Sequence, residues 1–395
     1  MQSPSKISGA FTSTTTPALW TPQGWADLPE GLLHSIVPLL GSFLDLLAFG
    51  GTCRSWRTAF TSYPSKSTFC TLLPPLLVRP HITVCAPHLP SKSDDGHKLR
   101  TCQVLDLANS KRKLCCQIPQ ETFRKLCFAG SSFGQLICGS GRNCLVVDVF
   151  TGAKVSPPQL PFGGDAYLYY GMLTSPLASK NPHLLVCVAP NWRGCDCSLL
   201  DWLVGSDSWS ELRLGDSRIE QIVEFKGQFI AWVAMDGDYK LYTLSIAPQL
   251  GLQEIATMWW DGMDECPYLR PWIVVCGDML IMVGDCMSMR LPVNYKAYRL
   301  DMSIAPAVWV EMKKLENHSL FIGSDVRIPA PGRWGGSCNY LYYVYYFQPW
   351  VLHGLGDEAD AVWDPYSDPA LAFQRRWYAQ LQPFWVYPSM LYADG

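Results

Sequence analysis

The chain has 395 residues, of which 48% are hydrophobic and 16% are charged, so most of it carries enough apolar surface to fold. Its 31 basic and 34 acidic residues give a formal net charge of -3, which excludes a broadly basic surface for nucleic acid or for an anionic membrane. No apolar run reaches the roughly 18–20 residues that a membrane span requires. The sequence therefore predicts a globular protein that binds neither nucleic acid nor membrane, and its length favours roughly two or three domains.

Residues 1–24 are rich in Ser, Thr and Pro, and Lys6 is their only charge. A transit peptide would share the low acidity but would normally carry several arginines, and this segment has none. We therefore expect a disordered N-terminal tail.

Residues 25–62 are predicted to form a small helical domain. Asp27 can cap a first helix, with Glu30 three residues on completing the capping box. Pro29 lies in the first turn of this helix, and Pro38 should end or kink it. An apolar face at helical spacing is made by Leu32, Leu33, Ile36, Val37 and Leu40.

Two further short helices are expected. Ser42 can cap the second helix, and the pair Gly50 and Gly51 should stop it. Thr52 can cap a third helix that runs to Phe60. A unit of about 40 residues cannot bury all of these apolar faces alone, so one face should belong to a partner or to the downstream domain.

Residues 63–100 contain many prolines and are predicted to be a Pro-rich connector. From 101 to 390 the sequence changes to short apolar runs bounded by Gly, Asp and Pro, which are typical of strands. A weak repeat of strand, turn and strand recurs along this range. Its interval is close to the roughly 40–50 residues of a four-stranded propeller blade, with longer insertions in some units. We anchor the repeat at Asp106, Asp148, Leu203, Leu244, Asp301 and Asp364. This pattern favours a β-propeller over an irregular pair of β-sandwiches.

No catalytic or metal-binding pattern stands out. The 16 cysteines include no C-x-x-C pair, and the best remaining set, His81, Cys85 and His88, lacks a fourth ligand. No secretory segment precedes these cysteines, so we expect free thiols, no metal, no cofactor, and a protein of the nucleus and/or cytoplasm. The P-loop and G-x-G-x-x-G motifs are absent.

Two acidic clusters and one run of tyrosines have ordinary structural explanations. The acidic clusters, at 261–265 and 357–364, are typical of solvated loops. The run from Tyr340 to Phe347 could stack bases, but alternating tyrosines are more typical of a half-buried strand, and no basic groove accompanies them. The sequence therefore predicts a non-catalytic protein.

Residues 25–60 resemble an F-box, in which Leu28 and Pro29 open the motif and 53–57, CRSWR, close it. Downstream, five segments in order resemble the plant F-box family whose C-terminal domain is a KIB-type β-propeller, also called domain of unknown function 295. They are AGSSFGQLI at 129–137, DVFTGAKVSPPQLP at 148–161, VEFKGQFIAW at 223–232, AYRLDM at 297–302 and VWVEMKKLENHSLFIGSD at 308–325. The chain departs from the family at Gln135, where an aromatic residue is usual.

This resemblance implies a mainly β protein with a small α domain: a three-helix F-box followed by a propeller at 101–390, with six blades in preference to seven. It also implies a substrate-recognition subunit of a ubiquitin ligase, whose F-box docks a Skp1-like adaptor and, through it, a cullin, while the propeller holds a target protein. The expected adaptor-binding residues are Leu28, Pro29, Leu32, Ile36, Leu40, Leu44 and Trp56. Some of them could instead form the core of the helical unit.

The target site is expected in the longest interval between repeat units, from Asp301 to Asp364. Arg333 and Trp334 are the first candidates there, because exposed Trp and Arg are common at interface hot spots. Trp334 could instead fill a slot between blades. Two other functions stay open: a propeller that sequesters a partner without ligase assembly, because Pro38 and the paired glycines weaken the F-box, or a propeller enzyme or carbohydrate-binding protein.

Overall fold

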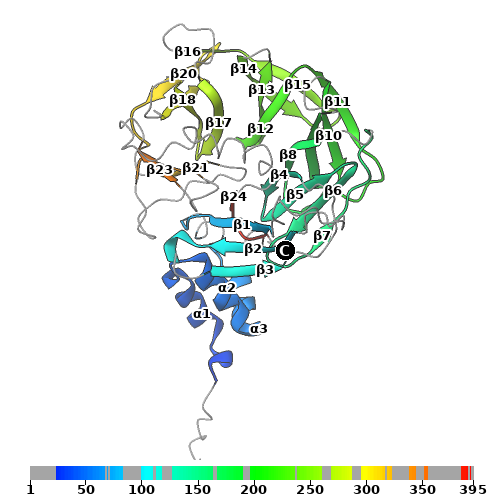
Figure 1. Ribbon diagram of the computed structural model, residues 1–395. Helices are drawn as coiled ribbons and strands as arrows, with labels where there is room; N and C mark the ends of the chain where they lie inside the picture. Colours follow the sequence, from blue (N-terminus) through cyan, green and yellow to red (C-terminus); the bar gives the residue numbers. More distant parts are fainter. Residues whose placement is uncertain are drawn as a thin grey trace, which may run out of the picture.

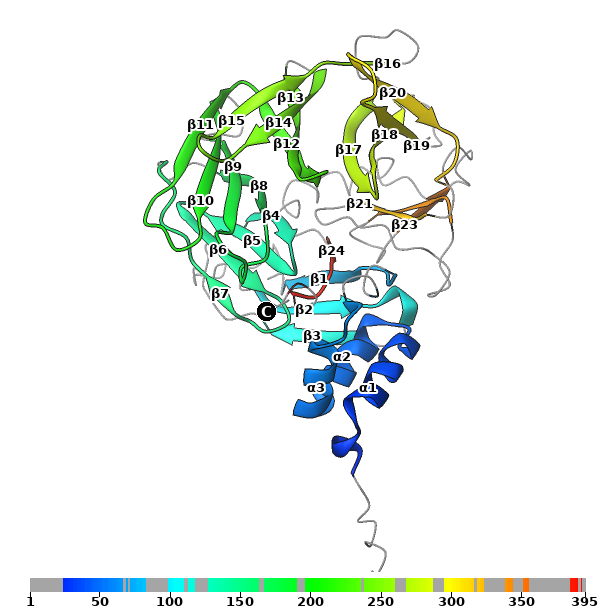
Figure 2. The ribbon, with the colours of Figure 1, turned by 180° about the vertical axis from the view of Figure 1, so that it is seen from behind.

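The described residues form six sheets that lie in a ring, and a small helical unit projects from the outer edge of one of them (Figure 1; Figure 2 shows the same ring from behind). The structure is a computed structural model. It describes residues 24–66, 69, 72–82, 99–109, 113–117, 127–162, 167–189, 196–235, 238–259, 268–286, 295–315, 318–322, 338–343, 351–354, 384–389 and 392. None of the helices in these ranges is long and apolar enough to cross a membrane.

The helical unit begins differently from the prediction. Its elements are η1 (Trp25–Asp27), α1 (Glu30–Ile36), η2 (Val37–Leu39), α2 (Phe43–Thr52) and α3 (Arg54–Thr61). The prediction that Asp27 caps the first helix is wrong, since Asp27 belongs to a 3₁₀ turn and Pro29 is the N-cap. Leu28 is extended, with ψ 135°, because a residue before proline is disfavoured in the helical region.

The predictions made from Pro38 and from Ser42 are confirmed. The α-helix ends at Ile36, and Pro38 lies in the first positions of η2. Ser42 is the N-cap of α2, and its hydroxyl accepts a hydrogen bond from the backbone N–H of Asp45 at 3.1 Å.

The glycine pair does not stop the second helix. α2 continues through Gly50 and Gly51 to Thr52, and Cys53 takes the N-cap position of α3 that the sequence assigned to Thr52. Gly50 is buried, and its carbonyl accepts a hydrogen bond from Arg57 Nε at 3.1 Å. Packing against α3 thus outweighs a helix cost of roughly 1 kcal/mol for each glycine.

The strands follow one another around the ring as antiparallel sheets. The first sheet has the order β24 (Phe384–Val386), β1 (Leu76–Ile82), β2 (Leu99–Leu105) and β3 (Lys113–Gln117). The second holds β4 (Cys127–Ser132), β5 (Gln135–Ser140), β6 (Asn143–Asp148) and β7 (Lys154–Val155). The third holds β8 (Tyr167–Leu173), β9 (His183–Ala189), β10 (Cys197–Leu203) and β11 (Ser210–Gly215).

The other half of the ring is built in the same way. The fourth sheet holds β12 (Arg218–Phe225), β13 (Gln228–Met235), β14 (Asp238–Ser245) and β15 (Gly251–Ile255). The fifth holds β17 (Tyr268–Cys276), β18 (Met279–Cys286), β19 (Tyr295–Asp301) and β20 (Ala307–Met312), and β16 (Thr257–Trp259) pairs parallel with β20 at its edge. In the described residues the sixth has three strands, β21 (Leu320–Ile322), β22 (Tyr340–Tyr343) and β23 (Val351–Gly354), and it departs from the antiparallel pattern because β21 pairs parallel with β22. A mainly β propeller with three N-terminal helices is therefore confirmed.

The internal repeat corresponds to the outer hairpins of the sheets. Three of its anchors are aspartates that end or directly follow the third strand of their sheet. Each of them accepts a hydrogen bond from a backbone N–H of the turn that follows. Asp106 Oδ1 accepts from Ala108 N at 2.9 Å, Asp148 Oδ1 from Phe150 N at 2.8 Å, and Asp301 Oδ1 from Ser303 N at 2.9 Å. The short aspartate side chain thus sets the reversal between the third and fourth strands.

The range predicted as a connector contains part of the propeller. β1 lies within 63–100 and pairs antiparallel with β2 and with β24, so it is an inner strand of the first sheet. Among the described residues the β24 pairing covers Leu76–Val78, and Pro80 lies beyond it, opposite Cys102 of β2. Pro80 is close to the register shift between His81 and Ile82, and a proline is tolerated in a sheet at such an irregularity.

Candidate docking surface on the helical unit

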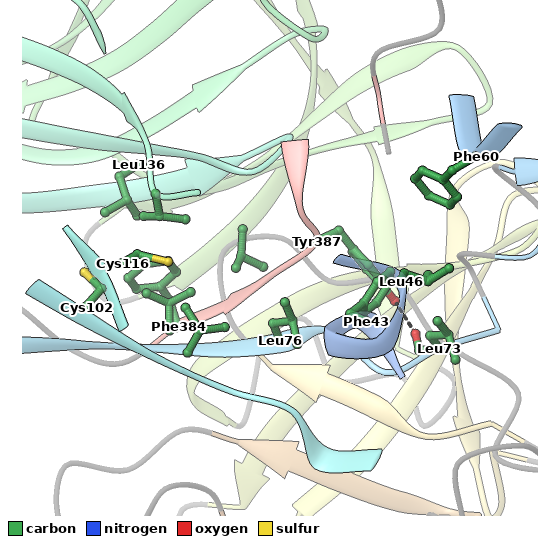
Figure 3. Close-up of a cluster of buried hydrophobic side chains, with 14 of the residues drawn as sticks. Phe43, Leu46, Phe60, Leu73, Leu76, Cys102, Cys116, Leu136, Phe384 and Tyr387 are labelled. Atoms are coloured by element: carbon green, nitrogen blue, oxygen red, sulfur yellow. Dashed lines mark hydrogen bonds between the residues drawn. The ribbon is translucent and has the colours of Figure 1, made fainter. Parts of the chain in front are cut away.

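The inner face of the helical unit is fixed on the propeller. One continuous core joins residues of α1, α2 and α3 to the first sheet, to β5 and to the C-terminal segment (Figure 3). Its members include Leu33, Val37, Phe43, Leu46, Phe49, Phe60, Leu73, Leu76, Val78, Cys102, Val104, Leu136, Phe384 and Tyr387. The downstream domain therefore takes one of the apolar faces that the helical unit cannot bury by itself.

Two contacts mark the junction. The ring of Phe43 on α2 meets the ring of Tyr387 edge-on, with centroids 5.5 Å apart. The N–H of Leu44 donates to Asp106 Oδ2 at 3.1 Å, and Asp106 is 1% exposed. The start of α2 is thus held by a side chain of the first sheet.

The outer face of the helical unit exposes large apolar side chains. Trp25 is 77% exposed, Leu32 54% and Leu39 80%, and these three are among eight exposed large hydrophobic residues of the described ranges. Pro29 is exposed beside them in sequence. An apolar surface on a unit whose other face is already covered is typical of a protein-binding site.

The seven residues predicted for docking divide into three groups. Leu32 and Pro29 are exposed. Four are half-buried and pack against the shared core, namely Leu28, Ile36, Leu40 and Trp56. Leu44 is 9% exposed, because α2 starts against the propeller at this point. Leu28, Ile36, Leu40 and Trp56 thus contact the core and also retain accessible surface.

Trp25 and Leu39 were not predicted, and local geometry explains both. Leu39 lies in η2, where the 3₁₀ turn at Pro38 breaks the 3.6-residue spacing that was used to select the apolar face. Trp25 lies before α1 in η1, and its carbonyl accepts a hydrogen bond from Trp56 Nε1 at 2.8 Å. A tryptophan just ahead of the Leu28-Pro29 pair was the available signal.

A polar cluster ties α1 to the end of α3. His34 Nε2 lies 3.2 Å from Ser62 Oγ and 3.6 Å from Glu30 Oε1, and the Ser62 hydroxyl also donates to Glu30. The His34 ring packs edge-on against Tyr63 with centroids 5.6 Å apart. These contacts hold the two helices that flank the exposed apolar side chains.

The predicted target residues lie elsewhere. Arg333 and Trp334 fall outside the described residues, as do both acidic clusters. Tyr340–Tyr343 forms β22, where Tyr342 is 2% exposed and stacks on Phe321 with centroids 4.7 Å apart. The interpretation of this tyrosine run as a strand is therefore confirmed for 340–343, and both Leu341 and Tyr342 are buried in it.

Thiols and metal ligands form no site in the described part of the chain. No group of three or more His, Cys, Asp or Glu side chains there could hold a metal ion. Seven cysteines in the described ranges are buried thiols: Cys102, Cys116, Cys138, Cys144, Cys187, Cys197 and Cys276. Burial raises the pKa of Cys102 and of Cys144 to about 12, so these thiols stay protonated and unreactive at neutral pH.

The junction aspartate should leave a signature in the pH dependence of stability. Burial raises the pKa of Asp106 above its ordinary value of 3.8, although hydrogen bonds from Leu44, Ala108 and Ser42 oppose the shift. The folded state therefore binds this proton more tightly than the unfolded chain. Its contribution to the free energy of unfolding is highest at low pH and falls as the pH rises from 3.8 through the folded-state pKa.

We expect Asp106→Asn to remove this dependence while keeping a carbonyl oxygen for the N–H of Leu44. Urea unfolding of both proteins across about pH 4–7.5 measures the difference in free energy of unfolding. The free energy of unfolding of the variant, relative to that of the wild type, should increase as the pH rises. Parallel pH curves would contradict the raised pKa.

Three comparisons place these features among known proteins. Residues 104–366 match the family model described as KIB1-4 beta-propeller. An Arabidopsis thaliana protein named "Putative F-box protein" is 24% identical over 339 residues, which are 82% of this chain and 88% of that protein.

Solved structures show weaker likeness. TolB from Acinetobacter baumannii is 11% identical, with 76% of this chain and 66% of TolB covered and a TM-score of 0.37. The β-propeller domain of the Trilobed protease from Pyrococcus furiosus is 9% identical, with 75% and 94% covered and a TM-score of 0.35. Likeness at such TM-scores supports no statement about function.

Proposed function

The chain belongs to the KIB1-4 β-propeller family, and from this premise we propose that it is the substrate-recognition subunit of a Skp1–cullin–F-box ubiquitin ligase. The helical unit docks a Skp1-like adaptor and, through it, a cullin, while the propeller binds the target protein. The protein itself has no catalytic role in this proposal. The similarity to a protein named as an F-box protein supports it.

The observation that carries this proposal is the two-sided helical unit. Its inner face is buried in the core shared with the propeller, and its outer face exposes Trp25, Leu32 and Leu39. Burying such side chains in an interface contributes roughly 1.5–3 kcal/mol each. The alternative, in which the predicted docking residues form the core of the helical unit, does not account for Leu32, which is 54% exposed.

The first test replaces the pair that opens the helical unit. Leu28→Ala with Pro29→Ala should weaken binding of a purified Skp1-like protein by roughly tenfold or more in a calorimetric titration, because buried apolar area is lost. The propeller should stay folded, which the thermal midpoint and circular dichroism of the same sample report. An unchanged affinity would remove these two residues from the contact.

We further propose that the target binds near Arg333 and Trp334. Replacing both by Ala should abolish recovery of the target in co-purification under proteasome inhibition, since Trp and Arg dominate many interface hot spots. Binding of the Skp1-like protein and the thermal midpoint should not change. A double variant that unfolds would show that these residues are core.

We also propose six blades, with the sheet of β21, β22 and β23 as the sixth. Trp385 of β24 supports this count, because its ring meets Phe321 of β21 edge-on at 5.0 Å and thereby joins the sixth sheet to the first. The ring then runs from the first sheet to the sixth and back.

A further inference from the structure

Two aspartates, each in a turn of one of two neighbouring sheets, accept hydrogen bonds from segments at opposite ends of the chain through their second carboxylate oxygen. Asp106 and Asp148 each accept a hydrogen bond from their own turn through Oδ1. Asp106 Oδ2 accepts from Leu44 N of α2 at 3.1 Å, whereas Asp148 Oδ2 accepts from Ser389 Oγ at 2.5 Å. For Asp301, the described bonds go to its own turn at Ser303. The repeated aspartate thus has an added role in the two sheets where the chain ends dock.

The C-terminal segment lies between these two aspartates. After β24 it continues to Ser389, whose backbone lies so close to Gly134 that a Cβ there would sit 2.3 Å from Ser389 N. Gly134 also has φ +77°, a conformation that favours glycine. Farther on, Tyr392 meets the ring of Phe133 edge-on with centroids 5.0 Å apart. The turn between β4 and β5 therefore contacts the C-terminal region at Ser389 and at Tyr392.

Tyr387 connects this segment to the helices. It is 2% exposed, its ring contacts Phe43 of α2, and its hydroxyl donates to the carbonyl of Leu73 at 3.3 Å (Figure 3). Leu73 precedes β1, which pairs with β24. One side chain thus touches the helical unit and the strand pair that closes the ring.

We propose that the C-terminal segment 384–389 is a shared latch, so that closure of the propeller and seating of the helical unit are one cooperative event. Opening the segment removes the Tyr387 ring from Phe43, so the start of α2 loses this contact and keeps the hydrogen bond from Leu44 N to Asp106. Because coupling between two sites is reciprocal, loosening α2 also loosens β24. This inference concerns the fold and holds whether or not the helices bind an adaptor.

The test is hydrogen exchange of the full-length protein, measured by mass spectrometry, with Ser389→Ala. The substitution removes the hydrogen bond to Asp148. The described bonds and close approaches of Ser389 are to Asp148, Gly134 and the N–H of Tyr392, and none of these lies in α2. Amides of both β24 and α2 should nevertheless exchange faster, by about fivefold or more, while those of β12–β15 stay unchanged. The matched control is Ser303→Ala, at the turn of Asp301, which should change exchange only in its own sheet.

Two further variants keep the inference falsifiable if the first effect is small. Gly134→Ala pushes on Ser389 directly, and Phe43→Leu weakens the latch from the helical side. The first should speed exchange in α2, and the second should speed it in β24. Exchange that becomes faster only in the altered segment would overturn the shared latch. So would unchanged exchange in α2 with both Ser389→Ala and Gly134→Ala.

Discussion

Deletion of the chain from Leu381 onwards is expected to open the propeller and to make the protein aggregate. The deletion removes β24 and leaves the inner edge of β1 without a partner over Leu76–Val78. An unpaired apolar edge of this kind is a template for pairing with other chains. Size-exclusion chromatography and the thermal midpoint of the truncated protein measure both consequences.

The size of this effect follows from how deeply the strand is buried. Phe384 and Tyr387 are 2% exposed, and Trp385 and Val386 are 0% exposed. At roughly 1.5–3 kcal/mol for each side chain, their loss approaches the whole 5–15 kcal/mol by which a typical domain is stable. The strand also bridges its neighbours, since Phe384 stacks on Phe128 of β4 at 4.8 Å and Trp385 meets Phe321 of β21.

A shorter deletion is the control. Removing the residues after Tyr392 keeps β24 and the latch contacts, so the protein should stay monomeric with a thermal midpoint close to that of the full chain. If the longer deletion also stays monomeric with an unchanged midpoint, β24 takes no part in closing the ring.

A single charge on the helical unit is expected to abolish adaptor binding without unfolding the protein. Leu32→Glu places an exposed carboxylate in the first turn of α1. Glutamate is a good helix former, and an acidic side chain near a helix N-terminus is favourable, so the fold should tolerate it. An unpaired charge buried in an interface costs about 3 kcal/mol or more, which is roughly a hundredfold in Kd.

The matched control is Ile304→Glu, at the turn between β19 and β20. Ile304 is 55% exposed and Leu32 is 54% exposed, so the two substitutions add the same charge at equally accessible positions. Titration with a purified Skp1-like protein should show a large loss for Leu32→Glu and none for Ile304→Glu. Equal affinities of the two variants would place the docking surface elsewhere on the protein.

Several features were readable because they depend on near neighbours in the chain. Pro38 cannot continue an α-helix, and the Ser42 hydroxyl caps the N–H of Asp45 only three residues away. The aspartates of the outer hairpins bind backbone groups two residues on, so the repeat carried its own turn chemistry. Together with the family resemblance, these local signals were enough to predict the helical unit and the propeller.

Other features escaped prediction because tertiary packing outweighed the local signal. The buried environment of Gly50 keeps α2 helical through two residues that normally end a helix. The prolines of 63–100 suggested a connector, yet β1 becomes an inner strand through partners far away in the sequence. Burial on the two faces of α1 likewise depends on which side the propeller covers.

Hydrophobic spacing, caps and turns along the chain determined which segments become helices and strands, since each involves residues only a few positions apart. The closed ring and the shared core beneath α2 depend on contacts such as Leu76 with Val386, which lie at opposite ends of the propeller sequence. No window of sequence contains both partners of such a pair. Whether the pair forms depends on the twist and packing of all the sheets between them, which together bring the two strands side by side.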